Sequence, residues 1–339
     1  MNITTFEVIP FSIPFVTPLQ TAGNTYTHRE GLWLKLQYGE VIGVGDAAPL
    51  RGFSNESLKE VHYSLEGFHQ AVEGENIEVD DLIQLAVVHT LDIPAARFAL
   101  ESAIYDLAAK TARLPLAKYL NPNALSSIKV NGITGRNSPE DGFQIIKVKV
   151  GFRNLFDEIE NLVELTQAFG KDVKFRLDAN GAFDLVRAIR FCKEMEAFNI
   201  DYIEQPLPKE ELVDMAELRY HTEIPIAVDE SLTDLNSAEK IIDEQAVDVF
   251  IIKPMVSGGF TDCEKIINLA RVENIRTVIT TSLESVVGRT ACLHLAAAYE
   301  ITEACGLATA GFLNEEDQNP LIENGVIKLS NNPGLGIEI

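Results

Sequence analysis

The sequence predicts an α/β fold, a TIM-like (β/α)7β barrel preceded by a smaller N-terminal α+β capping domain. Two observations support this prediction. Strand-like runs fill residues 1–47, and helical patterns follow in residues 54–112. From residue 127 onward, short runs rich in valine and isoleucine alternate with longer amphipathic segments, as expected of β-α units repeated around a parallel sheet.

The predicted capping domain covers residues 1–125. Its strands are ITTFEVIPFSIPF and GLWLKLQYGEVIGVGDAAP, and Tyr38-Gly39-Glu40 in the second run supplies the turn of a hairpin. Two helices follow, SNESLKEVHYSLEGFHQAV and PAARFALESAIYDLAAKTA, and we expect Ser54 or Asn55 to cap the first. The C-terminal tail, residues 312–339, is expected to return and complete this domain.

The predicted catalytic barrel covers residues 126–311. Its candidate strands are IKVNGIT, IIKVKVG, VKFRLDAN, DYIEQP, PIAVDE, VDVFIIKP, RTVITTSLE and a weaker last one near CGLAT. Segments between them, such as FRNLFDEIENLVELTQAFG, have helical periodicity and would form the outer ring. An open doubly wound sheet shows the same alternation, but it normally carries a glycine-rich phosphate loop after its first strand, and VNGITGRNS is no such loop.

The composition argues against several classes of partner. The chain of 339 residues has 51 acidic and 28 basic side chains, and the resulting net charge of -23 repels nucleic-acid backbones and anionic lipid surfaces. The four cysteines form no Cys-x-x-Cys pair, and the N-terminus MNITTFEVIPFSIPF lacks the basic and apolar regions of an export signal. We expect a cytoplasmic protein that binds neither nucleic acid nor membrane, with homo-oligomerisation left open.

A charged residue closes each of five consecutive strand patterns in the predicted barrel. These residues are Lys149, Asp178, Glu204, Asp229 and Lys253, and each follows the one before it by 24 to 29 residues, about one β-α unit. Because active sites of β/α barrels lie at the carboxyl ends of the strands, the five should share one rim. Taken singly, each is more simply a solvated strand end or an ion pair. Three carboxylates converging in one confined site, however, need a cation, and oxygen ligands suit Mg²⁺.

This pattern resembles the muconate-lactonizing subgroup of the enolase superfamily, which carries Lys-x-Lys on the second barrel strand, Asp, Glu and Asp on the next three, and Lys on the sixth. The resemblance covers essentially the whole chain and implies an enolase-like fold, because these proteins also have an α+β capping domain. It implies that Asp178, Glu204 and Asp229 hold Mg²⁺, for which Mn²⁺ could substitute. It also implies that Lys149 and Lys253 are catalytic and face each other across a small carboxylate substrate.

Five further residues are candidate substrate contacts: Lys147, Arg176, Asn180, Ser282 and Ser285, with Glu230 supporting the site from behind. Lys147 points to the same side of its strand as Lys149 and is expected to orient it or to hold a carboxylate. Arg176 would contact an anionic substrate group or form an ion pair inside the barrel. Ser282 and Ser285 would present backbone N–H groups to a substrate carboxylate, or only cap a helix.

Within the subgroup, several segments resemble the o-succinylbenzoate synthase family: REGLWLKL, APLRGFSNE, KVKVG, RLDANGAF, YIEQPLP, AVDES, IIKPMVSGG and TTSLESVVG. This resemblance implies a lyase, more narrowly a hydro-lyase of menaquinone biosynthesis. The enzyme would remove water from 2-succinyl-6-hydroxy-2,4-cyclohexadiene-1-carboxylate, through a metal-stabilised enediolate, and form o-succinylbenzoate.

Two alternatives remain beside dehydration. One is an N-acylamino acid racemase or dipeptide epimerase of the same subgroup. Dipeptide epimerases typically carry Asp-x-Asp on the eighth strand for the substrate ammonium, where this chain has Ala308-Thr309-Ala310. The other is a non-catalytic barrel or solute-binding protein, which the intact set of five charged residues disfavours.

The capping-domain loops around residues 17–29 and 51–54 are expected to close the site and set specificity, as they do in the family that the chain resembles. Arg29 and Arg51 lie in these loops. A single arginine in a loop is usually solvated, so the sequence assigns neither of them a role.

Overall fold

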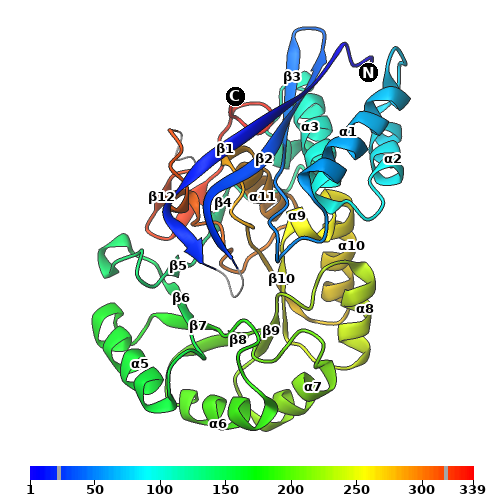
Figure 1. Ribbon diagram of the computed structural model, residues 1–339. Helices are drawn as coiled ribbons and strands as arrows, with labels where there is room; N and C mark the ends of the chain where they lie inside the picture. The colour runs from blue at the N-terminus through cyan, green and yellow to red at the C-terminus, as the bar shows by residue number, and fades with distance from the viewer. Residues whose placement is uncertain (21–23, 317–319) are drawn as a thin grey trace.

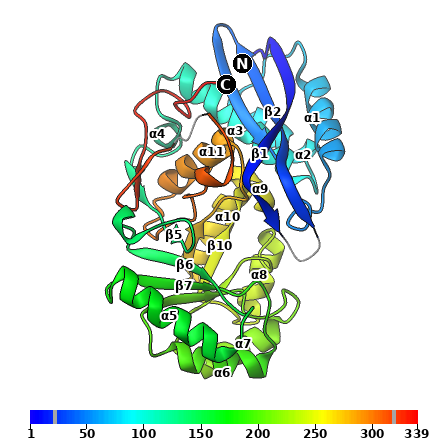
Figure 2. The same cartoon turned by 60° about the vertical axis from the view of Figure 1, so that its left-hand side comes forward.

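The computed structural model describes residues 1–20, 24–316 and 320–339, and it shows a capping domain packed on a β/α barrel (Figures 1 and 2). Residues 21–23 of the predicted capping loop and residues 317–319 of the predicted tail lie outside the described part. Within the described ranges, no helix is both long and apolar enough to cross a membrane. The domain bounds given above stay a prediction.

Three antiparallel strands form the sheet of the cap: β1 (Thr5–Gln20), β2 (Thr25–Tyr38) and β3 (Val41–Ala47). The predicted hairpin joins the last two strands, and Tyr38 pairs with Val41 beside its turn. The register also places Phe11 opposite Gly31, where a side chain would overlap the phenylalanine ring. Glycine at this position therefore lets the ring lie flat across β2.

Four helices complete the cap: α1 (Leu58–Val72), α2 (Val79–His89), α3 (Pro94–Thr111) and α4 (Leu116–Leu120). The cap of α1 is Ser57, so the prediction of Ser54 or Asn55 was wrong. The Ser57 backbone N–H donates to Glu60 Oε2 at 2.8 Å, while the serine side chain accepts from the Glu60 N–H. Ser57, unlike Ser54 and Asn55, has glutamate three residues later, which is the signature of a capping box.

The α3 helix lies between the cap sheet and the barrel and is buried on all sides. Its backbone approaches β3 so closely that a side chain at Gly45 would overlap the backbone of Ala99. On its other side, Phe98 stacks on Phe260 of α10 (Gly259–Val272), with 6.2 Å between ring centroids. Small alanine side chains fit this position because neighbours surround the helix completely.

Seven parallel strands form the barrel sheet in the order β11-β10-β9-β8-β7-β6-β5. Their bounds are β5 (Gly132–Ile133), β6 (Ile145–Lys149), β7 (Lys174–Asp178), β8 (Ile200–Glu204), β9 (Ile226–Val228), β10 (Val249–Ile252) and β11 (Arg276–Ile279). The weak eighth strand predicted near CGLAT closes the ring through two isolated parallel bridges, from Cys305 to Val130 and from Gly306 to Thr280. The predicted (β/α)7β barrel is therefore the observed fold.

Helices cover the outside of the barrel (Figure 1). They are α5 (Leu155–Phe169), α6 (Leu185–Met195), α7 (Leu212–His221), α8 (Leu235–Asp243), α9 (Pro254–Ser257), α10 and α11 (Val286–Ala298), with the short 3₁₀ turns η1 (Pro139–Asp141) and η2 (Ala310–Phe312). The crossover from β5 to β6 carries η1 in place of an α-helix.

The first predicted barrel strand, IKVNGIT, divides into two parts. Ser127–Lys129 forms β4, which pairs with β13 (Val326–Lys328) and through it with β12 (Ile322–Glu323) of the tail. The tail also reaches the cap, because the Leu335 N–H donates to Asp106 Oδ1 at 2.7 Å. The C-terminal segment thus contacts both the barrel side and the cap.

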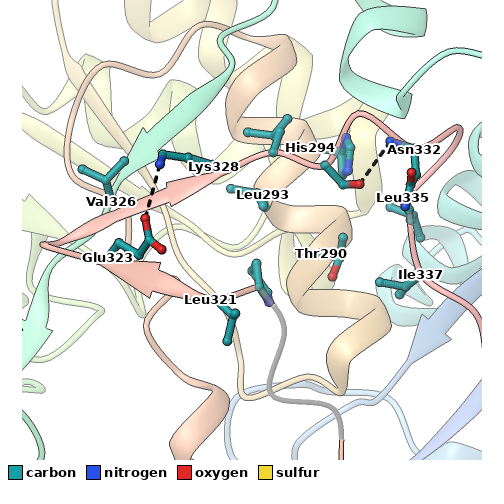
Figure 3. Close-up of a pocket in the computed structure, with 14 residues that line it drawn as sticks. Thr290, Leu293, His294, Leu321, Glu323, Val326, Lys328, Asn332, Leu335 and Ile337 are labelled. Carbon is teal, nitrogen blue, oxygen red and sulfur yellow. Dashed lines mark hydrogen bonds and ion pairs between the residues drawn. The ribbon is translucent and has the colours of Figure 1, made fainter.

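The tail and α11 enclose a cavity of about 390 Å³, shown in Figure 3. His294 of α11 lies on its wall, and its Nδ1 accepts a hydrogen bond of 3.0 Å from the Ala117 N–H of α4. Burial lowers the pKa of His294 to about 4. The imidazole is therefore neutral at physiological pH and joins α11 to the cap.

Candidate active site

The five charged residues that were expected to share a rim lie at the carboxyl ends of neighbouring strands. The sheet register pairs Lys149 with Asp178, and Asp178 with Glu204, at the ends of β6, β7 and β8. Asp229 directly follows β9, and Lys253 directly follows β10. A cavity of about 210 Å³ opens here, and all of these residues except Glu204 line it.

Ammonium groups stand between the carboxylates at this rim. Lys147 Nζ lies 2.8 Å from Glu204 Oε1 and 3.0 Å from Asp178 Oδ2. Lys149 Nζ lies 2.8 Å from the same Asp178 oxygen. Across the described ranges, no three acidic, histidine or cysteine side chains are grouped closely enough to hold a metal ion in this arrangement.

The carboxylates nevertheless have the chemistry of a magnesium site. Asp178, Glu204 and Asp229 are 2 %, 1 % and 6 % exposed. Asp178 Oδ1 is buried and has no hydrogen-bond partner among the residues that the structure describes. A set of carboxylate oxygens, one of them buried without a hydrogen-bond partner in the described part of the chain, fits Mg²⁺. These three residues therefore remain our proposed ligands.

Burial and neighbouring charges set the protonation of the rim. Burial raises the pKa of Glu204 to about 8, and the charges of Asp178 and Asp229 add to this effect while Lys147 opposes it. Burial would also raise the pKa of Asp178, but Lys147 and Lys149 outweigh it and hold that pKa at about 2.

The two most buried lysines of the rim remain charged. Burial alone would lower the pKa of Lys147, but Asp178 and Glu204 raise it well above its ordinary value. Burial opposes the charge on Lys253 as well, and Asp229, with its oxygen 2.6 Å from Nζ, raises the pKa of that lysine. Both side chains therefore carry a proton throughout the neutral range.

Asn180 lines the cavity next to Lys149. Its φ of 44° lies in the left-handed region, which few residues other than glycine adopt easily. In this conformation Asn180 Oδ1 accepts a hydrogen bond from Lys149 Nζ, and Asn180 Nδ2 donates to Glu230 Oε1 at 2.8 Å. The structure thus places Glu230 behind Asn180, and Asn180 beside the proposed base.

Arg176 does not line the cavity, although a substrate contact was one expectation for it. It lies two residues before Asp178 on the same face of β7, so it occupies a layer about 7 Å deeper in the barrel. Its guanidinium donates to Asp201 Oδ2 at 2.8 Å and packs over the Tyr202 ring, 4.6 Å from the centroid. The geometry supports the other expectation, an interior ion pair.

The two serines after β11 have different positions. Ser282 lines the cavity, but its N–H donates to both oxygens of Glu284 at 2.8 Å. Ser285 is the N-cap of α11 and lies away from the cavity lining, with its N–H donating to Asp46 Oδ2 at 2.9 Å. The expectation that these N–H groups are available to a substrate carboxylate was therefore wrong, because carboxylates of the chain already accept from them.

The individual apolar side chains of the cavity wall were not predicted, although Leu19 and Phe53 lie in the loops that were expected to close the site. The wall contains Leu19, Leu50 and Phe53 from the cap, Ile133 and Leu283 from the barrel, and Phe312 at the start of the tail. A polar pair lies beside it, since the hydroxyl oxygens of Thr281 and Thr309 are 2.9 Å apart. Single apolar residues in loops give no pattern in the sequence, so no signal distinguished these side chains from others.

Arg51 is exposed and does not line the cavity, whereas Arg29 is 1 % exposed. The Arg29 guanidinium donates to the backbone oxygen of Leu283 at 2.9 Å. Arg29 thus extends from the cap into the barrel, and it is not a solvated arginine.

Comparisons with known proteins agree with this fold. Residues 136–339 match the family model described as enolase C-terminal domain-like, and residues 3–106 match the model of the MenC N-terminal domain. The chain therefore belongs to the enolase superfamily, as its residue pattern indicated.

The chain is similar to several named enzymes. It is 30 % identical over 316 residues to the L-amino acid-D/L-Glu epimerase of Francisella philomiragia, covering 89 % of this chain and 87 % of that one. It is 24 % identical over 354 residues to the N-succinyl-L-Arg/Lys racemase of Bacillus cereus, covering 100 % and 96 %. The dipeptide epimerase of Enterococcus faecalis, solved with Mg and L-Leu-L-Tyr, superposes with a TM-score of 0.88 at 26 % identity, covering 99 % of both chains.

These names agree better with the racemase or epimerase alternative than with dehydration.

Proposed function

We propose that this protein removes the proton next to a carboxylate from a small anionic substrate, and that the reaction it completes is the dehydration that forms o-succinylbenzoate. The positions of Lys149 and Lys253 support the removal of a proton. β6 and β10 are four places apart in a ring of eight, so Lys149 and Lys253 enter the cavity from opposite sides. A substrate between them has one amine on each face.

The carboxylates would hold the metal that such a reaction needs. We propose Asp178, Glu204 and Asp229 as the ligands, on the evidence of their burial and of the unpartnered Asp178 oxygen. When bound, Mg²⁺ would stabilise the negative charge that develops on the substrate carboxylate as the proton leaves.

Lys149 is the proposed base. In its neutral form it takes the proton beside the carboxylate, and the electron pair of the broken C–H bond moves toward that carboxylate. Lys149 then gives the same proton to the hydroxyl group on the same face, the C–O bond breaks, and water leaves as the ring becomes aromatic. Asn180 holds the Lys149 amine in place, and Lys253 keeps its proton and stabilises the intermediate from the other face.

The choice of substrate depends on the residues at the end of the eighth strand. The acidic residues lining the cavity are Asp178 and Asp229, both among the proposed metal ligands. Ala308 and Ala310 stand where a dipeptide epimerase would carry its two aspartates. A substrate with a free ammonium group would find no free carboxylate among these lining residues. We also take the MenC N-terminal match over residues 3–106 as support for the synthase.

Racemisation of an N-acylamino acid is the second candidate, and the names of the relatives favour it. Such a substrate also lacks a free α-ammonium group. The first step is the same, but Lys253 would return a proton to the opposite face of the carbon, so its role distinguishes the two reactions.

One experiment separates the candidates. Purified protein with Mg²⁺ is incubated with the cyclohexadiene substrate while loss of the diene absorbance is followed. In parallel, N-succinylamino acids and L-Ala-L-Glu are incubated in D₂O and deuterium uptake is followed by NMR. We expect fast dehydration of the cyclohexadiene substrate and no deuterium uptake by L-Ala-L-Glu. Rapid exchange of N-succinylamino acids without dehydration would replace the synthase proposal with the racemase.

A further inference from the structure

We infer that Arg29 is a positioning residue that holds two walls of the active-site cavity in their places and thereby sets substrate binding. This inference depends on the proposed function in one respect, because both take this cavity to be the place where the substrate binds. Arg29 belongs to the cap, and the cavity walls that it joins come from separate segments of the chain.

The contacts of Arg29 connect these segments. Its Nε donates to the carbonyl oxygen of Leu283 at 2.9 Å, and Nη2 donates to that of Ser282 at 3.3 Å. Nη1 donates to the carbonyl oxygen of Pro49 at 3.3 Å, and Nη2 also bonds that of Ala48. Leu283 lies on the barrel side of the cavity, and Leu50, which follows Pro49, lies on the cap side.

The turn on the barrel side needs such support. Leu283 has a φ of 63°, a left-handed conformation that is strained for a branched side chain. The Glu284 carboxylate accepts a hydrogen bond from the Ser282 N–H of this turn. Arg29 donates to the carbonyl oxygens of Ser282 and Leu283 in the same turn. The strained conformation persists because these hydrogen bonds fix it from both sides.

The surrounding charges explain why a cation is tolerated there. The Arg29 side chain is 1 % exposed, and burial lowers its pKa, while the carboxylates of Glu284 and Asp46 favour its charge and oppose that effect. Its planar fork reaches several carbonyl oxygens at fixed angles, whereas a lysine ammonium is a compact charge on a flexible chain. Lysine at this position would keep the charge and lose the geometry.

Substrate binding is the property that should change. Both cavity walls held by Arg29 are apolar, through Leu50 and Leu283, while the proposed base and metal ligands lie on β6 to β9. Loosening these walls should therefore raise KM and leave kcat nearly unchanged, because the interactions lost are made equally in the ground state and the transition state.

The test compares Arg29→Lys with Arg113→Lys, which alters an exposed arginine of the cap. We expect KM to rise about tenfold in Arg29→Lys with kcat changed less than about threefold, and neither constant to change in the control. Amide hydrogen exchange is measured on the same proteins. It should become about tenfold faster in peptides covering Ala48–Leu50 and Ser282–Ser285 in Arg29→Lys alone.

Unchanged KM and unchanged exchange in Arg29→Lys would overturn the inference, and so would a loss of kcat at constant KM. If Arg29→Lys does not fold, Glu284→Gln supplies the test, because it loosens the same turn from its other side and should raise KM and speed exchange at Ser282. Wild-type protein that acts on none of the substrates would refute the proposed function, while hydrogen exchange would still decide the role of Arg29.

Discussion

Lys253 Nζ lies 5.0 Å from the centre of the Phe53 ring, so a charged group at the barrel rim faces an aromatic side chain of the cap. A cation over an aromatic face is stabilised by about 0.5–2 kcal/mol. Phe53→Leu keeps an apolar wall but removes the ring, and we expect kcat/KM to fall roughly 3- to 30-fold. Steady-state kinetics measure this, with Phe156→Leu, an exposed phenylalanine of α5, as the control. Equal kinetics in both variants would exclude a role for the ring.

Lys149→Ala should abolish turnover and leave the fold intact. The Lys149 side chain is 59 % exposed, so its removal creates no buried cavity, whereas the reaction loses its base. We expect kcat to fall by at least about 10³-fold, with circular dichroism and Tm close to those of the wild type. Lys171→Ala changes an exposed lysine and should behave as wild type. Near-normal activity of Lys149→Ala would remove this residue from the mechanism.

Binding of Mg²⁺ should be visible without any substrate. A ligand that binds the folded state at one hundred times its Kd adds about 2.7 kcal/mol to the free energy of unfolding, so Mg²⁺ should raise Tm by a few degrees. Asp229→Asn removes one carboxylate charge from the proposed set and should abolish most of this rise. The measurement is thermal unfolding with MgCl₂ against KCl at equal ionic strength. An equal rise in wild type and variant would place the cation elsewhere.

Acidification should destabilise the protein partly through His294. Its pKa is about 4 in the folded state and about 6.5 in the unfolded state, so the unfolded state binds the proton more readily between these values. The contribution to stability is present above pH 6.5 and is lost as pH falls toward 4, by about 2 kcal/mol between pH 7 and pH 5. Urea unfolding of wild type and His294→Gln at both pH values tests this. The variant should lose less stability, because glutamine accepts from Ala117 without titrating.

The repeated strand-end charges made the fold and the rim predictable. Register in a parallel sheet converts a spacing of one β-α unit into neighbouring positions, so Asp178 and Glu204 had to meet at one edge. Depth within the barrel was harder to predict. Arg176 and Asp178 share a strand face, but the two-residue step places the arginine a layer lower, against Asp201.

Contacts made by tertiary packing left no trace in the sequence. Ser285 looks like any residue that starts a helix, and only the folded chain brings Asp46 to its N–H. Arg29 looks like a loop arginine, and two of its partners are backbone oxygens some 250 residues away along the chain. Backbone carbonyls exist at every position, so no residue pattern marks the ones that a distant side chain will bond.

The burial of α3 has a consequence for the way in which the molecule opens. One continuous apolar core contains Leu34 of the cap sheet, Phe98 of α3 and Ile252 of the barrel. Swinging the cap away from the barrel as a rigid unit would expose this core to water, at a cost comparable to that of unfolding. We therefore expect substrate to reach the rim by local movement of side chains and loops, and we expect the cap and the barrel to unfold together.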